Sequence, residues 1–303
     1  MNIEQTETKA LRIGILISFL MALAGWVTYY LSGSDAMLLD GNFSFISVVA
    51  GVVAIVISNK KHDKTKTFPF GSYVYEALFV LIKGLLMLGI ILVAGLQNSL
   101  KIIAYLKGKQ IETVEIGPIL IYVVIVSVLC FAQFFFYKSK NKKINNSSSI
   151  LHIETKSTLL DGFMSLGIGF VFMIIWFLPA ASSFDFLKSI GDALIVLMMC
   201  LVFFTMPLKI IRESFIELGG GVLQDTASKE LAESTIIDLL PSNLGKQGIY
   251  ISKLGSSYFV LLYVSSATNT INLATVTALR KKIQESLGKM FTNVKVEIIV
   301  NYN

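Results

Sequence analysis

Two carboxylates, Asp40 and Asp161, stand inside long apolar segments, where acidic side chains are rare. The first begins "DGNFSFISVVAGVVAIVIS", which carries no further charge, and the second lies within "STLLDGFMSLGIGFVF". An ionisable side chain at bilayer depth costs at least about 2.5–3.5 kcal/mol on insertion scales, so it needs a partner or a hydrated cavity. Both acids are therefore candidates for binding a cation.

Helical spacing places other oxygen-bearing side chains on the same helix face as each acid, because residues three, four or seven apart share one face of a helix. The face of the first segment reads Asp40, Phe43, Ser44 and Ser47, and that of the second reads Glu154, Ser157, Asp161 and Ser165. If the two faces meet, they form an all-oxygen pocket, which suits hard or borderline cations such as Mg, Mn or Ca. Serine hydroxyls are weak ligands, so affinity would depend on the carboxylates.

These residues also have structural interpretations. Serines often let membrane helices approach and hydrogen-bond to one another, and Asp40 is close enough to the start of its segment to lie at the membrane interface. Lys83 lies about two turns into another apolar segment, from which it either snorkels to the membrane edge or pairs with Asp161 or Glu154.

Composition identifies the solvent around these segments. Apolar residues make up 54% of the chain and charged residues 15%, well below the roughly one quarter charged in soluble domains. Six apolar runs reach the length of about 20 residues that a membrane helix needs, at 11–31, 36–58, 75–98, 116–137, 155–178 and 189–211. The first leads directly into the second without a small-x-small cleavage site, so we expect a span there and not a signal peptide. We predict an all-α six-helix transmembrane bundle over residues 1–218.

Lysine placement predicts the orientation of the bundle. Two connections are basic: the second-to-third with Lys60, Lys61, Lys64 and Lys66, and the fourth-to-fifth with Lys138, Lys140, Lys142 and Lys143. By the positive-inside rule these connections and both termini are cytoplasmic. We expect the plasma membrane by default, from the length of the chain and the absence of a targeting sequence. The net charge of +6 then reflects topology, and we expect lipid but no nucleic acid as a partner. Cys130 and Cys200 fall inside spans and form neither a disulfide framework nor a CxxC metal signature.

Residues 219–303 have the composition of a small soluble domain. "TASKELAESTIIDLL" has helical periodicity with a candidate cap at Thr226, and two β-rich runs flank a turn at Gly255–Ser257. A second amphipathic helix and the strand "NVKVEIIVN" follow. The order α-β-β-α-β predicts a ferredoxin-like α+β cytoplasmic domain, in which two helices cover one face of a sheet. Gly219–Gly221 fits a hinge between the two parts better than a phosphate loop, since no GKS/T sequence accompanies it.

Several motifs resemble those of the cation diffusion facilitator family. "AMLLDGNFSFIS" is similar to that family's second-span motif, and "FPFGSYVYEAL" to its "HPFGHGRAEAL", with Pro69, Phe70, Gly71 and Glu76 retained. "STLLDGFMSLGIG" resembles the fifth-span motif, and "SIGDALIVLMMCLVFFTMPLKIIRESFIELGGG" the sixth span, including an acid at Asp192. "ISKLGSSYFVLLYV" looks like the first hairpin of the family's cytoplasmic domain. The resemblance covers nearly the whole chain.

The resemblance implies a homodimeric exporter that exchanges a divalent metal cation for protons through a site between spans two and five. The family's four ligand positions fall on Phe43, Ser47, Ser157 and Asp161, so that only Asp161 retains a standard ligand. Asp40 matches the aspartate of the family's "LLAD" stretch, about 4.5 Å along the helix from the level of Phe43. A divergent branch of the family with "LLDG", "FPFG" and altered ligands resembles this chain more than the zinc exporters do. His62 lies in a loop and His152 precedes span five, so a tetrahedral zinc site with nitrogen ligands is disfavoured.

The sequence thus predicts a proton-coupled transporter and not an enzyme, without a cofactor and with a divalent cation as its substrate. Its shifted site would contain Asp40, Ser44, Ser47, Ser157 and Asp161, with Glu154 at the cytoplasmic mouth and Lys83 as a possible counter-ion. An alternative is a non-transporting scaffold or regulator in which Lys83 replaces the metal by pairing with Asp161. Transport of a different cationic solute is a third interpretation.

Overall fold

The computed structural model describes residues 3–60, 65–68, 71–143, 149–177, 186–241, 244–266, 273–291 and 293–301. The chain divides into two compact units. The first contains Met1–Val56 and Lys83–Leu208, and the second contains Ile57–Ile82 and Lys209–Asn303. The long helices α3 and α7 therefore begin or end near the boundary between the units.

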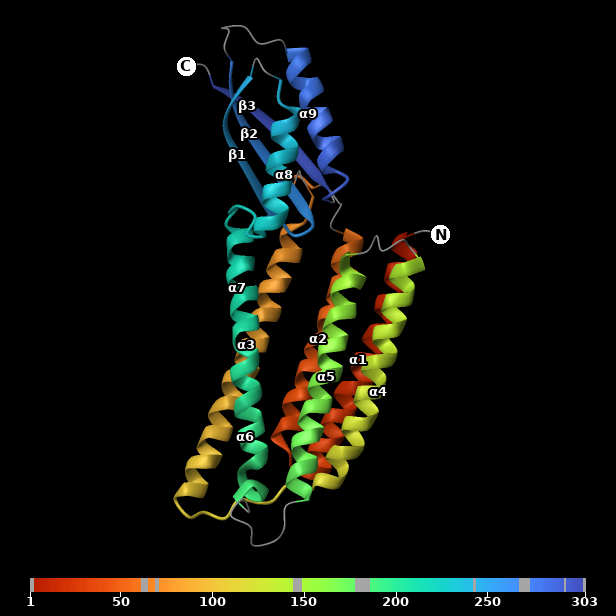
Figure 1. The fold of residues 1–303 in the computed structure, drawn as a ribbon, viewed down its shortest axis with the longest axis vertical. Coiled ribbons are helices and arrows are strands. Elements are labelled where there is room, and N and C mark those ends of the chain that lie inside the picture. Colours follow the sequence, from red (N-terminus) through yellow and green to blue (C-terminus); the bar gives the residue numbers. More distant parts are fainter. Residues whose placement is uncertain are drawn as a thin grey trace. The chain divides into compact units, whose positions relative to one another are not determined.

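The first 218 residues form seven helices in the described part of the chain (Figure 1). Their bounds are α1 Ile3–Ser32, α2 Asp35–Lys60, α3 Val74–Leu106, α4 Ile116–Lys143, α5 Ser149–Trp176, α6 Phe186–Phe203 and α7 Thr205–Leu218. Each predicted span coincides with one helix, except that the sixth is divided at Phe204 into α6 and α7. The basic residues His62, Lys61 and Lys64 and the motif residues Pro69 and Phe70 lie outside the described residues.

Five of these helical stretches are long and apolar enough to cross a membrane: α1, α2, α3, α4 and the combined α6–α7. The apolar part of α5, Asp161–Trp176, is shorter. Large apolar side chains such as Leu16, Phe163 and Leu201 stand on exposed outer faces, where a soluble protein would place polar residues. These features identify a helical membrane bundle, and a sixth full span through α5 remains a prediction.

Small residues permit close helix packing in the first unit. A Cβ atom on Gly25 of α1 would lie 2.7 Å from the Cα of Gly41 on α2, so only glycine fits this crossing. Gly169 of α5 packs in the same way against Val123 of α4. The core between the helices contains Met37, Tyr122, Phe172 and Val196 among its buried side chains. These contacts hold α2 and α5, which carry the predicted site, against α1 and α4.

The second unit contains an α-β-β-α-β segment, as predicted, with the elements α8 Thr226–Leu239, β1 Leu244–Leu254, β2 Ser257–Ser266, α9 Leu273–Leu287 and β3 Val294–Asn301. The sheet order is β1-β2-β3, with β1 antiparallel and β3 parallel to β2. Ile236, Ile251, Leu262 and Ile283 belong to its buried core, in which both helices pack on one sheet face. Asp225, not Thr226, is the N-cap residue of α8, because the helix already begins at Thr226.

Two glutamates bind the turn between β1 and β2 within the second unit. The backbone N–H of Ser256 donates to Glu76 Oε2 over 2.6 Å, and that of Gly255 donates to Glu217 Oε2 over 3.3 Å. Lys253 Nζ lies 2.9 Å from Glu217 Oε1. Burial, the largest single effect, would lower the pKa of Lys253, but the charge and hydrogen bond of Glu217, together with Tyr258 and Glu213, outweigh burial and raise the pKa. The motif residue Glu76 thus anchors the hairpin, which sequence analysis did not foresee.

Candidate functional site

Asp40 faces the bundle interior from the second turn of α2. Its side chain is half-buried, and its Oδ2 accepts a hydrogen bond of 2.5 Å from the hydroxyl of Tyr122 on α4. Tyr122 itself is only 2% exposed and belongs to the buried stripe of α4. A short bond from a phenol to a carboxylate is among the stronger hydrogen bonds in proteins. Tyr122 therefore fixes the orientation of the Asp40 carboxylate.

Asp161 lies on α5, with an exposed side chain, and close enough to Asp40 for the two carboxylates to repel one another. The neighbouring Gly162 brings the α5 backbone onto α4, since a Cβ atom there would lie 3.1 Å from the Cβ of Cys130. The two acids that the sequence singled out thus lie on two different helices and within electrostatic range of one another.

Cys130 stands behind this pair on α4, two turns from Tyr122. It is buried, its Sγ lies 3.6 Å from the Sδ of Met21 on α1, and it lies within electrostatic range of both Asp40 and Asp161. Within the described residues, no group of three or more His, Cys, Asp or Glu side chains is assembled as a metal site. Two carboxylates therefore have to act with hydroxyl or water oxygens.

The predicted hydroxyl ligands contribute unequally. Ser44 is half-buried on the Asp40 face of α2. Ser47 is exposed, and its hydroxyl donates to the backbone carbonyl of Phe43 over 3.1 Å, which leaves its oxygen lone pairs for another contact. Ser157 belongs to α5, but its side chain lies outside the described residues. Neither serine of α2 is bound to a carboxylate among the contacts that the structure describes.

Two further charged residues lie close to Asp161. Glu154 lies on α5, about two turns before Asp161, and Lys83 lies on α3. Both side chains are half-buried and within electrostatic range of Asp161. Lys83 also lies within range of Glu154. Among the described side chains, however, no ion pair joins Lys83 to either acid. Lys83 thus contributes positive potential without occupying the position of a bound cation.

Comparison with known families agrees with this arrangement. A family model described as the cation efflux transmembrane domain matches residues 11–218, well over half of the chain. The chain belongs to the cation diffusion facilitator family. A search of curated proteins finds no match. Membership in the cation diffusion facilitator family, together with the apolar helices, supports an integral membrane protein that transports a metal cation. All the site residues described above fall inside the matched range.

Phe43 occupies one of the positions at which the resemblance to cation diffusion facilitators implied a ligand. Its ring packs against Phe203 at the end of α6, with centroids 5.7 Å apart and planes inclined at 60°. This position of α2 thus makes an apolar contact with α6. The nearest carboxylate on this face of α2 is that of Asp40, which is bonded to Tyr122.

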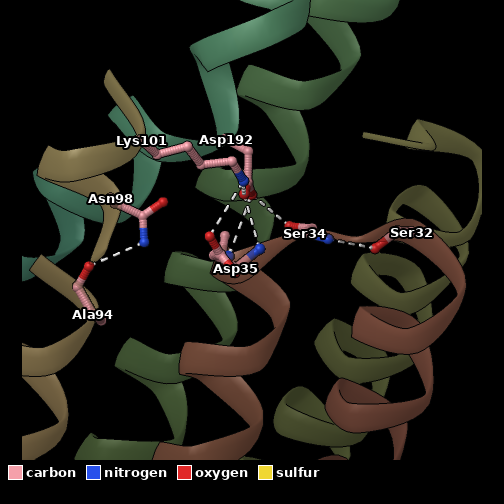
Figure 2. A network of polar contacts seen from close by, with 8 residues as sticks. Ser32, Ser34, Asp35, Ala94, Asn98, Lys101 and Asp192 are labelled. Atoms are coloured by element: carbon pink, nitrogen blue, oxygen red, sulfur yellow. Dashed lines mark hydrogen bonds and ion pairs between the residues drawn. The ribbon is translucent and has the colours of Figure 1, made fainter. Parts of the chain in front are cut away.

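A second polar cluster, which sequence analysis did not assign, holds the start of α2 (Figure 2). Asp192 of α6 accepts hydrogen bonds from the Ser34 hydroxyl over 2.6 Å and from the backbone N–H of Asp35 over 2.8 Å and of Ala36 over 3.3 Å. Lys101 of α3 lies 3.3 Å from Asp35 and 3.8 Å from Asp192. A carboxylate from another helix thus caps α2, where the helix dipole favours negative charge. The signal in the sequence was the acid at Asp192 inside an apolar run.

Proposed function

We propose that the protein exports a divalent metal cation in exchange for protons, through a site built on Asp40 and Asp161. The observation that supports this proposal is that the carboxylates of Asp40 on α2 and Asp161 on α5 lie within electrostatic range of one another and of Cys130 on α4. Two like charges in a low-dielectric environment repel strongly, so the pair needs either a cation or protons. The same pair therefore alternates between a metal-bound and a protonated state.

The donor set favours a hydrated, hard or borderline cation. Asp40 and Asp161 supply the carboxylate oxygens, and the hydroxyls of Ser44, Ser47 and Ser157 or water complete the shell. Carboxylate, carbonyl and water oxygens suit Mg, Mn and Ca, whereas a tetrahedral zinc site prefers nitrogen or sulfur ligands. Glu154, half-buried on the same helix as Asp161, provides a second carboxylate along the entry path.

The transport cycle consists of binding, reorientation and release. A cation that enters from the cytoplasm displaces protons from Asp161 and Asp40, and rocking of the helices then exposes the site to the opposite side. There protons displace the metal. In this proposal the termini are cytoplasmic, the membrane is the plasma membrane, lipid surrounds the bundle, and the α+β domain supports a homodimer. No chemical transformation is involved, so the protein is not an enzyme.

The non-transporting scaffold is the weaker alternative. It requires Lys83 to neutralise Asp161 in place of a metal. Since no ion pair between these two residues is found in the described part of the chain, and since Asp40 is the acid that repels Asp161 most, the arrangement favours transport. Lys83 would then limit the net negative charge of the pocket between transport steps.

Metal flux into proteoliposomes with an imposed pH gradient tests this function. We expect the wild-type protein to move one or more of Mg, Ca, Mn, Fe, Co, Zn and Cd only when the gradient is present, and Asp161→Ala to abolish movement. Asp238→Ala, a change at an exposed acid of α8, serves as the matched control and retains the wild-type rate. Absence of flux for every ion, unrestored by Lys83→Ala, would leave the scaffold as the better account.

A further inference from the structure

A cavity of about 290 Å³ lies between α2 and α3, within the first unit. Its polar lining consists of Asp35, Asn42, Gln97 and Asn98, and its remaining walls are apolar, with Leu38 and Ile90 among them. Asn42 follows Asp40 by two residues, so the two side chains point about 200° apart around the helix. The cavity is therefore on the opposite face of α2 from the Asp40–Asp161 site.

Asn98 is one of the residues that line this cavity, and its buried side-chain oxygen has no hydrogen-bond partner among the described residues. Its side chain is 1% exposed, its Nδ2 donates to the backbone carbonyl of Ala94 over 3.0 Å, and its Oδ1 accepts no hydrogen bond from the described residues. Figure 2 shows that oxygen turned away from Ala94. A buried, unsatisfied acceptor costs about 1–3 kcal/mol, so such a group commonly serves a ligand or ordered water.

Asp35 places a negative charge at the same cavity. Its carboxylate is a quarter exposed and forms an ion pair with Lys101, which is shared with Asp192. Two acids and one lysine sum to a charge of about −1, of which the N-terminus of α2 offsets a part, and the remaining negative charge favours a cation. Asn42 contributes an amide whose Oδ1 already accepts a bond from the indole N–H of Trp26 over 3.0 Å.

We propose that this cavity is a second cation site, which binds a hydrated divalent ion through the Asp35 carboxylate and the Asn98 amide oxygen. A cation with six waters needs roughly 200 Å³ at about 30 Å³ per water, so the cavity accommodates one. An ion such as Mg²⁺ or Mn²⁺ keeps several waters and binds through one or two carboxylates. The bound ion competes with Lys101 for Asp35, and thus loosens the contact between α2 and α3.

The indole of Trp26 supplies a local reporter for this site. The chain contains two tryptophans, so Trp176→Phe leaves Trp26, which touches the cavity through Asn42, as the single fluorophore. We would titrate the full-length Trp176→Phe protein in detergent with MnCl₂ and follow quenching by the paramagnetic ion, with Asp40→Asn and Asp161→Asn introduced together. In that background the Asp40–Asp161 site no longer binds, so quenching reports the cavity alone.

We expect saturable quenching that Mg²⁺ reverses. Asp35→Asn and Asn98→Leu should each raise the half-saturating Mn²⁺ concentration by about tenfold or more, since each removes one ligand oxygen. Asn98→Asp adds a carboxylate and should lower the half-saturating Mn²⁺ concentration. Gln133→Leu is the matched control, because Gln133 is also a buried amide with an unpartnered oxygen but lies on α4, away from the cavity.

Two results would overturn the proposal. One is the absence of saturable quenching in the Asp40→Asn, Asp161→Asn background. The other is quenching that neither Asp35→Asn nor Asn98→Asp changes. These two variants decide the question even if Asn98→Leu fails to fold. The measurement is made at equilibrium and without the transport site, so its failure is distinguishable from a failure of the proposed export function.

Discussion

The hydroxyl of Tyr122 lies 2.5 Å from the Oδ2 atom of Asp40, and it joins α4 to the acid at the start of the transport site. In the proposed site, Asp40 takes the role of a ligand position that is filled by Phe43, so another contact has to set the orientation of the Asp40 carboxylate. The tyrosine supplies this contact from a buried position. It also leaves one carboxylate oxygen of Asp40 for a metal or a proton.

Tyr122→Phe should weaken cation transport without unfolding the protein. The change removes the hydroxyl but keeps the buried ring, and loss of a hydrogen bond to a charged group corresponds to about a tenfold or larger loss in affinity. We expect a rise of that size in the metal concentration for half-maximal flux in proteoliposomes. Tyr30→Phe, at a side chain that is 87% exposed, is the control. If the metal concentration for half-maximal flux is unchanged in Tyr122→Phe, then Tyr122 does not position Asp40 for transport.

Asp192→Asn should destabilise the bundle. The carboxylate accepts bonds from Ser34, Asp35 and Ala36 and pairs with Lys101, whereas an amide offers one acceptor oxygen and no charge. We expect a loss of about 1–3 kcal/mol, seen as a lower thermal unfolding midpoint in detergent. Asp238→Asn on the exposed face of α8 should leave the midpoint unchanged, and equal midpoints for both variants would show that the cap of α2 is unimportant.

Gly25→Ala tests the crossing of α1 and α2. Its new Cβ would meet the backbone of Gly41 at 2.7 Å, and backbone cannot move aside as a side chain can, so overpacking should cost about 1–3 kcal/mol. Gly89→Ala is the matched control, because no atom lies within 4 Å of a Cβ at that position. We expect the thermal midpoint to fall only for Gly25→Ala. A fall of equal size in both variants would trace the effect to glycine flexibility instead.

Phe43→Asp should allow the protein to bind zinc more tightly. The substitution restores a carboxylate at a family ligand position, one turn from Asp40 and on the same helix face, at the loss of the Phe43–Phe203 ring contact. Ring pairs contribute about 0.5–1.5 kcal/mol beyond area burial and a carboxylate at bilayer depth costs about 2.5–3.5 kcal/mol, so folding of the variant is first checked by its thermal midpoint in detergent. Zinc binding measured by calorimetry should tighten relative to Phe43→Ala, which removes the ring alone. Equal binding in the two variants would contradict the placement of the site.

The sequence predicted the membrane helices well because a long apolar run has few alternatives to a spanning helix. It placed the turn at Gly255–Ser257 for a similarly local reason, since the pattern of β-rich residues ends there on both sides. It did not predict the division of the sixth span at Phe204. The signal in the sequence was Pro207, which has no N–H to bond to the carbonyl of Phe203 four residues earlier and whose ring crowds that carbonyl.

Contacts between distant residues were the part that the sequence could not supply. Tyr122 lies between apolar residues, as other tyrosines of the chain do, so the sequence does not single it out. Only the packing of α4 against α2 shows that its hydroxyl reaches Asp40. The roles of Asp192 and Glu76 depend equally on partners more than a hundred residues away. Helical spacing and antiparallel spans constrain Asp40 and Asp161 at once, so the sequence could predict that the two acids lie within electrostatic range of one another.

A double-mutant cycle in flux tests the central claim most directly. If Asp40 and Asp161 hold one ion together, Asp40→Asn, Asp161→Asn and the combined variant should lose proton-driven metal flux to the same extent, because removing either ligand already destroys the site. The measurement is the initial rate of metal entry into proteoliposomes under an imposed pH gradient, at matched protein content. Wild-type flux in Asp40→Asn would contradict the account, since the carboxylate shifted to position 40 would then take no part in transport.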